Sequence, residues 1–167
     1  MPKSMSWRPR VGWIVAISLI ATIPAHACWE QAGERYGVSP ELLYAIARTE
    51  SGLDPQAVGR NRNGSRDLGL MQINSAWLPR LATHGIAERD LFDPCTSIHV
   101  GAWILAGNVQ RLGYTWEAVG AYNAANPARR RAYAERIYRQ LNKASTPLQP
   151  RQPSTLSNRP LLTASAQ

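Results

Sequence analysis

The residue whose type and position best suit chemistry is Glu50, at the end of a predicted amphipathic helix. Ser39 is a suitable N-cap and Pro40 suits the first helical turn, so we expect the helix to begin there and to end at Gly52. The residues three, four and seven positions before Glu50 are apolar, which places Glu50 on the core-facing stripe. Loss of water and the negative end of the helix dipole both favour its protonated form. Glu50 is therefore a candidate general acid; a solvated Glu at a fraying helix end is the alternative that this helix alone leaves open.

Residues 69–74 place two amide side chains, Gln72 and Asn74, among apolar neighbours instead of at an obvious surface. Amides can hydrogen-bond neutral sugar hydroxyls and N-acetyl groups without adding a charge. The polar segment before them, residues 59–67, contains Asn63-Gly64, a strong signal for a tight turn. We expect a loop or a small hairpin there, beside the active site, whose arginines form a solvated face.

The first 27 residues have the pattern of a secretory signal peptide. A basic start is followed by an apolar run over residues 11–23 and by Ala25-His26-Ala27, a small-x-small cleavage pattern. The run is short for a membrane span and no later segment qualifies, so we expect a periplasmic protein with no integral span after cleavage. Because cleavage removes three of the 19 basic residues and none of the 11 acidic ones, the formal net charge falls from +8 to +5. That charge suits an anionic surface, and with no nucleic-acid-binding motif present we expect no nucleic-acid partner.

The chain has two cysteines, Cys28 and Cys95, and both lie in the part expected to be exported. In an oxidising compartment such a pair indicates a disulfide. A catalytic thiol is the alternative, but no Cys-His motif surrounds His84 or His99. A lipid anchor on Cys28 is another, although Ala25 stands where a lipoprotein signal normally has Leu. No helical His/Glu pair indicates zinc, so we expect neither a metal nor a cofactor.

We expect residues 28–143 to form one mainly helical domain, and residues 144–167 to form a disordered tail rich in Ser, Thr, Pro and Gln. Besides the Glu50 helix, apolar spacing predicts helices over residues 29–36, from Asn74 or Ser75 to before Gly85, over residues 94–112 with Asp93 as N-cap, after Thr115, and from about Pro127. The helix over residues 94–112 is the expected centre of the core. The side chains expected to face the core are Trp77, Leu78, Leu81, Ile98, Ala102, Leu105, Val109, Leu112, Tyr133, Ile137, Tyr138 and Leu141.

Four short motifs follow one another in the globular part of the chain. They are Glu50-Ser51-Gly52, Gly69-Leu70-Met71-Gln72-Ile73-Asn74, Asp93-Pro94-Cys95 and Ala121-Tyr122-Asn123-Ala124. In this order they resemble the soluble lytic transglycosylase family, in the small single-domain branch associated with conjugation and with type III and type IV secretion systems. The resemblance covers residues 28–143. It implies a lysozyme-like, mainly α (α+β) fold that cleaves peptidoglycan between N-acetylmuramic acid and N-acetylglucosamine.

The resemblance also assigns roles to individual residues. The family's catalytic acid falls on Glu50, and the tyrosine that approaches the catalytic carboxyl falls on Tyr122. The Cys28–Cys95 pair matches the disulfide of this branch. The other residues expected to bind substrate or to orient the acid are Ser51, Met71, Gln72, Asn74 and Asn123, with Met71 and Gln72 on the segment that lines the groove.

The implied chemistry uses one carboxyl group. Glu50 protonates the glycosidic oxygen, the N-acetyl group of the substrate stabilises the oxocarbenium-like centre, and Glu50 then takes the proton of the muramoyl 6-hydroxyl, which closes a 1,6-anhydro ring. Hydrolytic glycosidases ordinarily need two carboxylates. Of the other acids, Asp54 and Asp67 are expected in loops, with Asp67 as a turn or cap residue.

Two alternative functions stay open. One is a muramidase that hydrolyses the same bond, with Asp54 or Asp67 positioning water. The other is a non-catalytic wall-binding adaptor that recruits a secretion machine, although a pure binder has no need of a buried acid. We expect a monomer that acts on peptidoglycan glycan strands and opens the wall locally for a conjugation or secretion apparatus.

Overall fold

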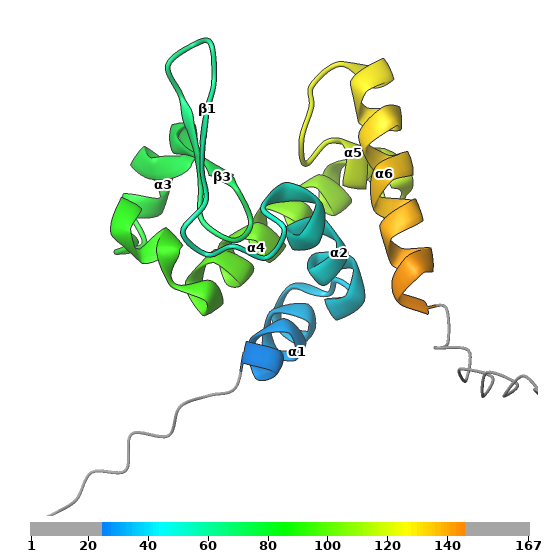
Figure 1. The fold of residues 1–167 in the computed structure, drawn as a ribbon, viewed down its shortest axis with the longest axis horizontal. Helices are drawn as coiled ribbons and strands as arrows, with labels where there is room; N and C mark the ends of the chain where they lie inside the picture. Colours follow the sequence, from blue (N-terminus) through cyan, green and yellow to red (C-terminus); the bar gives the residue numbers. More distant parts are fainter. Residues whose placement is uncertain (1–24, 146–167) are drawn as a thin grey trace, which may run out of the picture.

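The computed structural model describes residues 25–145, with side chains for residues 27–143. It contains mostly helices and one small antiparallel sheet (Figure 1), so the predicted mainly α fold is confirmed. The predicted signal peptide lies almost entirely outside the described residues. The last helix continues through Ser145, two residues into the predicted tail, and residues 146–167 lie outside the described part.

The first two helices bring Glu50 to the middle of the domain. α1 (Ala25–Tyr36) packs against α4, and the predicted disulfide joins Cys28 on α1 to Cys95. α2 (Pro40–Glu50) begins as predicted, because the Ser39 hydroxyl accepts the N–H of Leu42 at 3.1 Å. Gly52 follows the helix with a φ of +67°, a left-handed conformation that suits glycine.

The polar segment after α2 forms the predicted hairpin. β1 (Val58–Arg60) pairs with β2 (Arg66–Leu68), and β2 pairs with β3 (Ile73–Asn74), all antiparallel. Gly64 lies at the turn with a φ of +83°. The expectation that Asp67 is a turn or cap residue is wrong: it lies in β2, opposite Gly59 on one side and Asn74 on the other.

Helical segments then lead from the sheet into the core. η1 (Ser75–Trp77) and α3 (Leu78–Ala82) form the helix predicted after Asn74, whose side chain accepts the N–H of Ala76 at 3.0 Å. η2 (Glu88–Phe92) was not predicted, because one short 3₁₀ turn leaves no apolar period to detect. α4 (Pro94–Leu112) has the predicted bounds and cap, with Asp93 accepting the N–H of Thr96 at 2.8 Å.

The last two helices are α5 (Trp116–Gly120), capped by Thr115, and α6 (Pro127–Ser145). On α6 the predicted core residues Tyr133 and Ile137 are buried. The prediction for Tyr138 is wrong: its side chain is 52% exposed and meets Trp116 edge-on at 5.4 Å. Tyr138 follows Ile137 directly, and successive helical residues point about 100° apart, so both cannot face the core.

The domain has two sides that meet at α2 and α4. Figure 1 shows the hairpin and α3 on one side of α2, with α5 and α6 on the other. Side chains from α2, α4, α6 and the sheet form one buried cluster, which includes Leu43, Ile46, Leu68, Met71, Ile98, Leu105, Tyr133 and Ile137. Within residues 25–145, no helix is long and apolar enough to cross a membrane.

Candidate active site

Glu50 lies in a polar pocket of about 560 Å³ between the two sides of the domain. The hairpin contributes one wall, through Asn61, Asp67 and their neighbours, and Gln72, Asn74 and Trp77 continue it. Ile104 of α4 also lines the pocket, as do Tyr122 and Asn123, which follow α5. Of the residues predicted for the site, Glu50, Gln72, Asn74, Tyr122 and Asn123 line this pocket, and Ser51 and Met71 do not.

The carboxyl group of Glu50 is half-buried at the last residue of α2. Burial raises the pKa of Glu50, and the nearby Asp67 carboxylate adds to the increase. A hydrogen bond from Tyr133 and interactions with Arg136 and Asn123 act in the opposite direction. Because burial is the largest of these effects, the pKa of Glu50 stays above its ordinary value, as a general acid requires.

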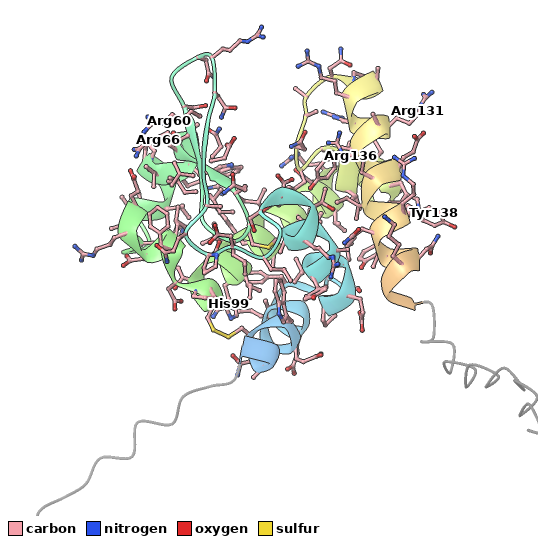
Figure 2. The ribbon with its side chains drawn as sticks, viewed as in Figure 1. Arg60, Arg66, His99, Arg131, Arg136 and Tyr138 are labelled. Atoms are coloured by element: carbon pink, nitrogen blue, oxygen red, sulfur yellow. A yellow bond between two sulfur atoms is a disulfide. The ribbon has the colours of Figure 1, made fainter. Side chains whose placement is uncertain are left out.

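The hydroxyl that contacts Glu50 belongs to Tyr133 on α6. It donates to Oε1 of Glu50 at 2.6 Å, and the Tyr133 side chain is only 1% exposed. The guanidinium of Arg136 lies 5.4 Å from the centre of the Tyr133 ring, and Figure 2 shows Arg136 on the side of α6 that faces the hairpin. The apolar spacing of α6 predicted a core position for Tyr133 but gave no indication of this contact. A buried tyrosine hydroxyl usually has a hydrogen-bond partner, so the predicted burial of Tyr133 was itself an indication that its hydroxyl contacts a polar group.

Tyr122, which the resemblance placed against the catalytic carboxyl, makes a different hydrogen bond. Its hydroxyl donates to the backbone carbonyl of Met71 at 3.0 Å. Burial raises the pKa of Tyr122, and the carboxylates of Glu50 and Asp67 add to the increase, so its proton stays available for that bond. Tyr122 therefore contributes to the pocket wall and fixes the segment opposite it.

Ser51 and Met71 hold the backbone around the pocket. The Ser51 hydroxyl donates to the Leu70 carbonyl at 2.8 Å, which fastens the end of α2 to the segment before β3. The N–H of Met71 donates to Oγ of Ser97 on α4 at 3.1 Å. The side chain of Met71 is fully buried against Gly101, so it belongs to the core and not to the groove surface expected for it.

Gln72 shapes the pocket through an unusual backbone conformation. Its φ is +49°, in the left-handed region, and its amide nitrogen donates to the carbonyls of Ala57 at 3.1 Å and Gly69 at 2.9 Å. Both N–H groups of the Gln72 side-chain amide are therefore bonded to backbone carbonyls. These bonds compensate for a backbone conformation that non-glycine residues rarely adopt. The carbonyl oxygen of the Gln72 amide is the part that can accept a hydrogen bond from a sugar.

Asp67 is the second carboxylate of the pocket. Its Oδ1 accepts the Asn74 amide at 2.7 Å and its Oδ2 accepts the Asn61 amide at 2.9 Å, so it is fixed in position. Asp54 is exposed, accepts the N–H of Gln56 and does not line the pocket. A strand in which Leu68 faces the core directs the preceding Asp67 to the other face of the sheet, toward the pocket.

Within the described part of the chain, no three or more His, Cys, Asp or Glu side chains lie together as a metal site would require. The arrangement can deliver a proton from Glu50 to a ligand oxygen and can take one back. The amides and carboxylates around it can hold hydroxyl and N-acetyl groups.

The chain is similar to known proteins over most of its length. Residues 27–144 match the family described as "Transglycosylase SLT domain". The chain is 49% identical over 137 residues to "Invasion protein IagB" of Salmonella typhimurium (strain SL1344), an alignment that covers 78% of this chain and 86% of that protein. It is 46% identical over 117 residues to "Protein IpgF" of Shigella flexneri, covering 67% of this chain and 77% of that protein.

A further relative is the "Peptidoglycan-binding-like protein" of Escherichia coli O157:H7, 39% identical over 140 residues and covering 75% of this chain and 84% of the relative. Among solved structures, that of an inactive mutant of lytic transglycosylase Slt from Pseudomonas aeruginosa superposes with a TM-score of 0.51 at 23% identity. The match covers 69% of this chain and 20% of that much longer one, and it supports the fold. The chain therefore belongs to the transglycosylase SLT family of peptidoglycan lytic transglycosylases.

Proposed function

We propose that this peptidoglycan lytic transglycosylase uses Glu50 as its catalytic acid and base, and that it leaves 1,6-anhydromuramoyl ends. The observation that carries the proposal is the environment of Glu50: a half-buried carboxyl, its pKa raised by burial, at the wall of a polar pocket. A raised pKa keeps a larger fraction of the carboxyl protonated, and so able to donate a proton, than in an ordinary glutamate at the same pH. Its position is fixed by the 2.6 Å bond from Tyr133, whose own ring is buried.

The reaction transfers one proton out of Glu50 and one back. The Glu50 carboxyl protonates the glycosidic oxygen, the bond from that oxygen to C1 of the muramoyl sugar breaks, and positive charge develops at C1. The carbonyl oxygen of the substrate's N-acetyl group stabilises this charge. The muramoyl 6-hydroxyl oxygen then bonds to C1 and gives its proton to the Glu50 carboxylate, so the enzyme returns to its starting state and no water is consumed.

Asp67 gives the hydrolytic alternative a specific basis. Its carboxylate lines the same pocket as Glu50 and is fixed by two amides, which is a possible arrangement for a group that positions water or stabilises positive charge. In the transglycosylase mechanism the same carboxylate adds to the stabilisation of C1 that the N-acetyl group of the substrate provides. The two mechanisms differ in their products.

The test is product analysis by mass spectrometry after purified peptidoglycan is digested in water enriched in heavy oxygen. A transglycosylase yields 1,6-anhydromuramoyl ends that carry no solvent oxygen, whereas a hydrolase yields reducing ends labelled from water. The matched control is Glu50→Gln, which keeps the shape of the side chain and removes the proton that is transferred. Cleavage by Glu50→Gln at the wild-type rate would show that the acid lies elsewhere.

The site of action is the cell envelope, where peptidoglycan lies. We extend the proposal to a local role, in which the enzyme opens the wall for a secretion or conjugation apparatus; the support is similarity to a relative named an invasion protein. Export by a signal peptide over residues 1–27 and a catalytically dispensable segment after residue 145 belong to the same proposal. Deletion of residues 146–167 should leave lysis of purified cell walls intact, and loss of most of the activity in a folded protein would contradict this.

A further inference from the structure

A second pocket adjoins the active-site pocket and shares two wall residues with it. Trp77 and Ile104 line both. The second pocket has a volume of about 280 Å³ and lies between α3 and α4, with Arg80, Trp103, Gln110 and Arg111 among its lining residues. The two pockets therefore adjoin at Trp77 and Ile104, so a ligand of the second pocket lies next to one held beside Glu50.

Two tryptophans and an arginine form the aromatic wall of the second pocket. Trp77 and Trp103 meet edge-on at 5.4 Å, and both are half-buried. The guanidinium of Arg80 lies 4.7 Å from the centre of the Trp103 ring and 5.9 Å from that of Trp77. A guanidinium stacked on aromatic rings is held in place while the N–H groups at its edge remain able to donate.

Arg80 and Arg111 supply the positive charge of this pocket, and neither has a carboxylate partner within residues 27–143. Arg111 donates from Nη2 to the Asn108 side chain at 2.5 Å, and its guanidinium has further donors. The floor between the walls is open, because a Cβ added at Gly107 would meet only Arg111 Nη1, at 3.8 Å.

We propose that this second pocket is an anionic subsite, which binds the carboxylate on the muramoyl side chain of the glycan strand being cleaved. The inference rests on the proposed function. Peptidoglycan strands alternate neutral sugars with muramoyl sugars, whose lactyl group ends either in a free carboxylate or in a peptide that carries carboxylates. Sugar rings can pack on Trp77 and Trp103 while Arg80 and Arg111 hydrogen-bond the carboxylate. The enzyme then distinguishes peptidoglycan from a neutral glycan by charge as well as by shape.

The test measures binding to Glu50→Gln protein, which should not cleave its ligand. Three ligands of matched length are titrated: glycan strands with their peptides, the same strands after the peptides have been removed by an amidase, and neutral chitin oligosaccharides. In this background Arg80→Gln should weaken binding of carboxylate-bearing strands about two- to fivefold at low salt, the upper part of the range for an exposed charged contact. Binding of chitin oligosaccharides should change less than about twofold, and added salt should reduce the difference between the variants.

Two further variants control for folding and for net charge. Arg80→Lys keeps the charge but loses the planar donor edge, so it should restore part of the affinity. Arg131→Gln removes the same charge from α6, where Figure 2 shows Arg131 pointing away from the hairpin, and should leave all three affinities unchanged. Arg111→Gln should repeat the selective loss seen with Arg80→Gln.

The outcomes separate the inference from the function on which it rests. If Arg80→Gln weakens binding of the neutral and the charged ligands equally, or changes the binding of neither, the inference of an anionic subsite is wrong and the proposed function stands. If the parent protein binds none of the three glycans, the proposed function itself fails. A loss confined to strands with peptides identifies the peptide carboxylates as the ligand, and an equal loss on amidase-treated strands identifies the lactyl carboxylate.

Discussion

Replacement of Tyr133 by Phe should change how the activity depends on pH, and not only how large it is. The hydroxyl of Tyr133 donates to Glu50 at 2.6 Å, and the substitution removes only that hydroxyl from a buried ring. The bond favours the ionised form of Glu50 and so opposes the increase in pKa that burial causes. Its loss must therefore raise the pKa of Glu50 further. Because protonated Glu50 is the acid, the variant should retain a larger fraction of its maximal activity at high pH than the wild type does.

The size of the effect follows from the strength of a hydrogen bond to a charged acceptor. Such bonds contribute about 1.5–3 kcal/mol, and Glu50 is only half-buried, so the lower end applies. About 1.4 kcal/mol corresponds to a tenfold change in an ionisation equilibrium. The alkaline limb of kcat/KM against pH should move upward by about one pH unit. The maximal rate should also fall, because the carboxyl loses the contact that fixes its orientation.

The assay is the initial rate of lysis of purified cell walls between about pH 4 and pH 9, for the wild type, Tyr133→Phe and Tyr138→Phe. Tyr138 is a matched control on the same helix, since it is 52% exposed and Figure 2 shows it pointing away from the hairpin. Its substitution should leave the profile unchanged. If Tyr133→Phe is less active at every pH but its alkaline limb stays at the wild-type pH, the hydroxyl has no effect on the pKa of Glu50 and serves packing alone. A limb displaced to lower pH would refute the reasoning outright.

Three further predictions concern the disulfide, Glu50 and Gly101. Loss of the disulfide in the double variant Cys28→Ala/Cys95→Ala should lower the free energy of unfolding by about 4 kcal/mol, the chain-entropy value for a sequence separation of 67. Free-thiol titration of the native wild type should find no reactive thiol. Glu50→Gln should raise the melting temperature at pH 7 and not at pH 4. Because the pKa of Glu50 is raised in the folded state, protonation of Glu50 stabilises the fold. That stabilisation is present below the unfolded-state pKa and is lost as the pH rises through the folded-state pKa, whereas glutamine stays neutral at both pH values. Gly101→Ala should lower the free energy of unfolding by about 1–3 kcal/mol and reduce lysis, because the added Cβ would lie 2.6 Å from Met71 Cε and 3.0 Å from the Tyr122 hydroxyl. The control is Gly107→Ala on the same helix, whose Cβ would meet nothing closer than 3.8 Å and should not destabilise the fold. Equal melting temperatures for the two glycine variants would contradict the packing described around Met71.

Local sequence was sufficient for the helices whose ends are capped. Ser39 and Asp93 each accept a backbone N–H of the first helical turn, and such caps act within a few residues of the chain, so α2 and α4 could be located from sequence. The Asn63-Gly64 turn was equally local. Local patterns were insufficient on α6, where Ile137 and Tyr138 are both apolar enough to face the core. The way α6 docks against α2 and α5 decides which of them does.

The sequence by itself determined the family, the candidate acid and the cysteine pair, because residue types at fixed spacings carry that information. It could not determine which tyrosine contacts Glu50. Tyr122 and Tyr133 are both buried enough to require an acceptor, and the choice depends on how α6 docks against α2 across 83 residues of chain. The same holds for Asp67, which enters the pocket only because β2 pairs on both sides and directs alternate side chains toward Glu50. Contacts between residues so distant in sequence are set by tertiary packing, and for that reason only the folded structure decides them.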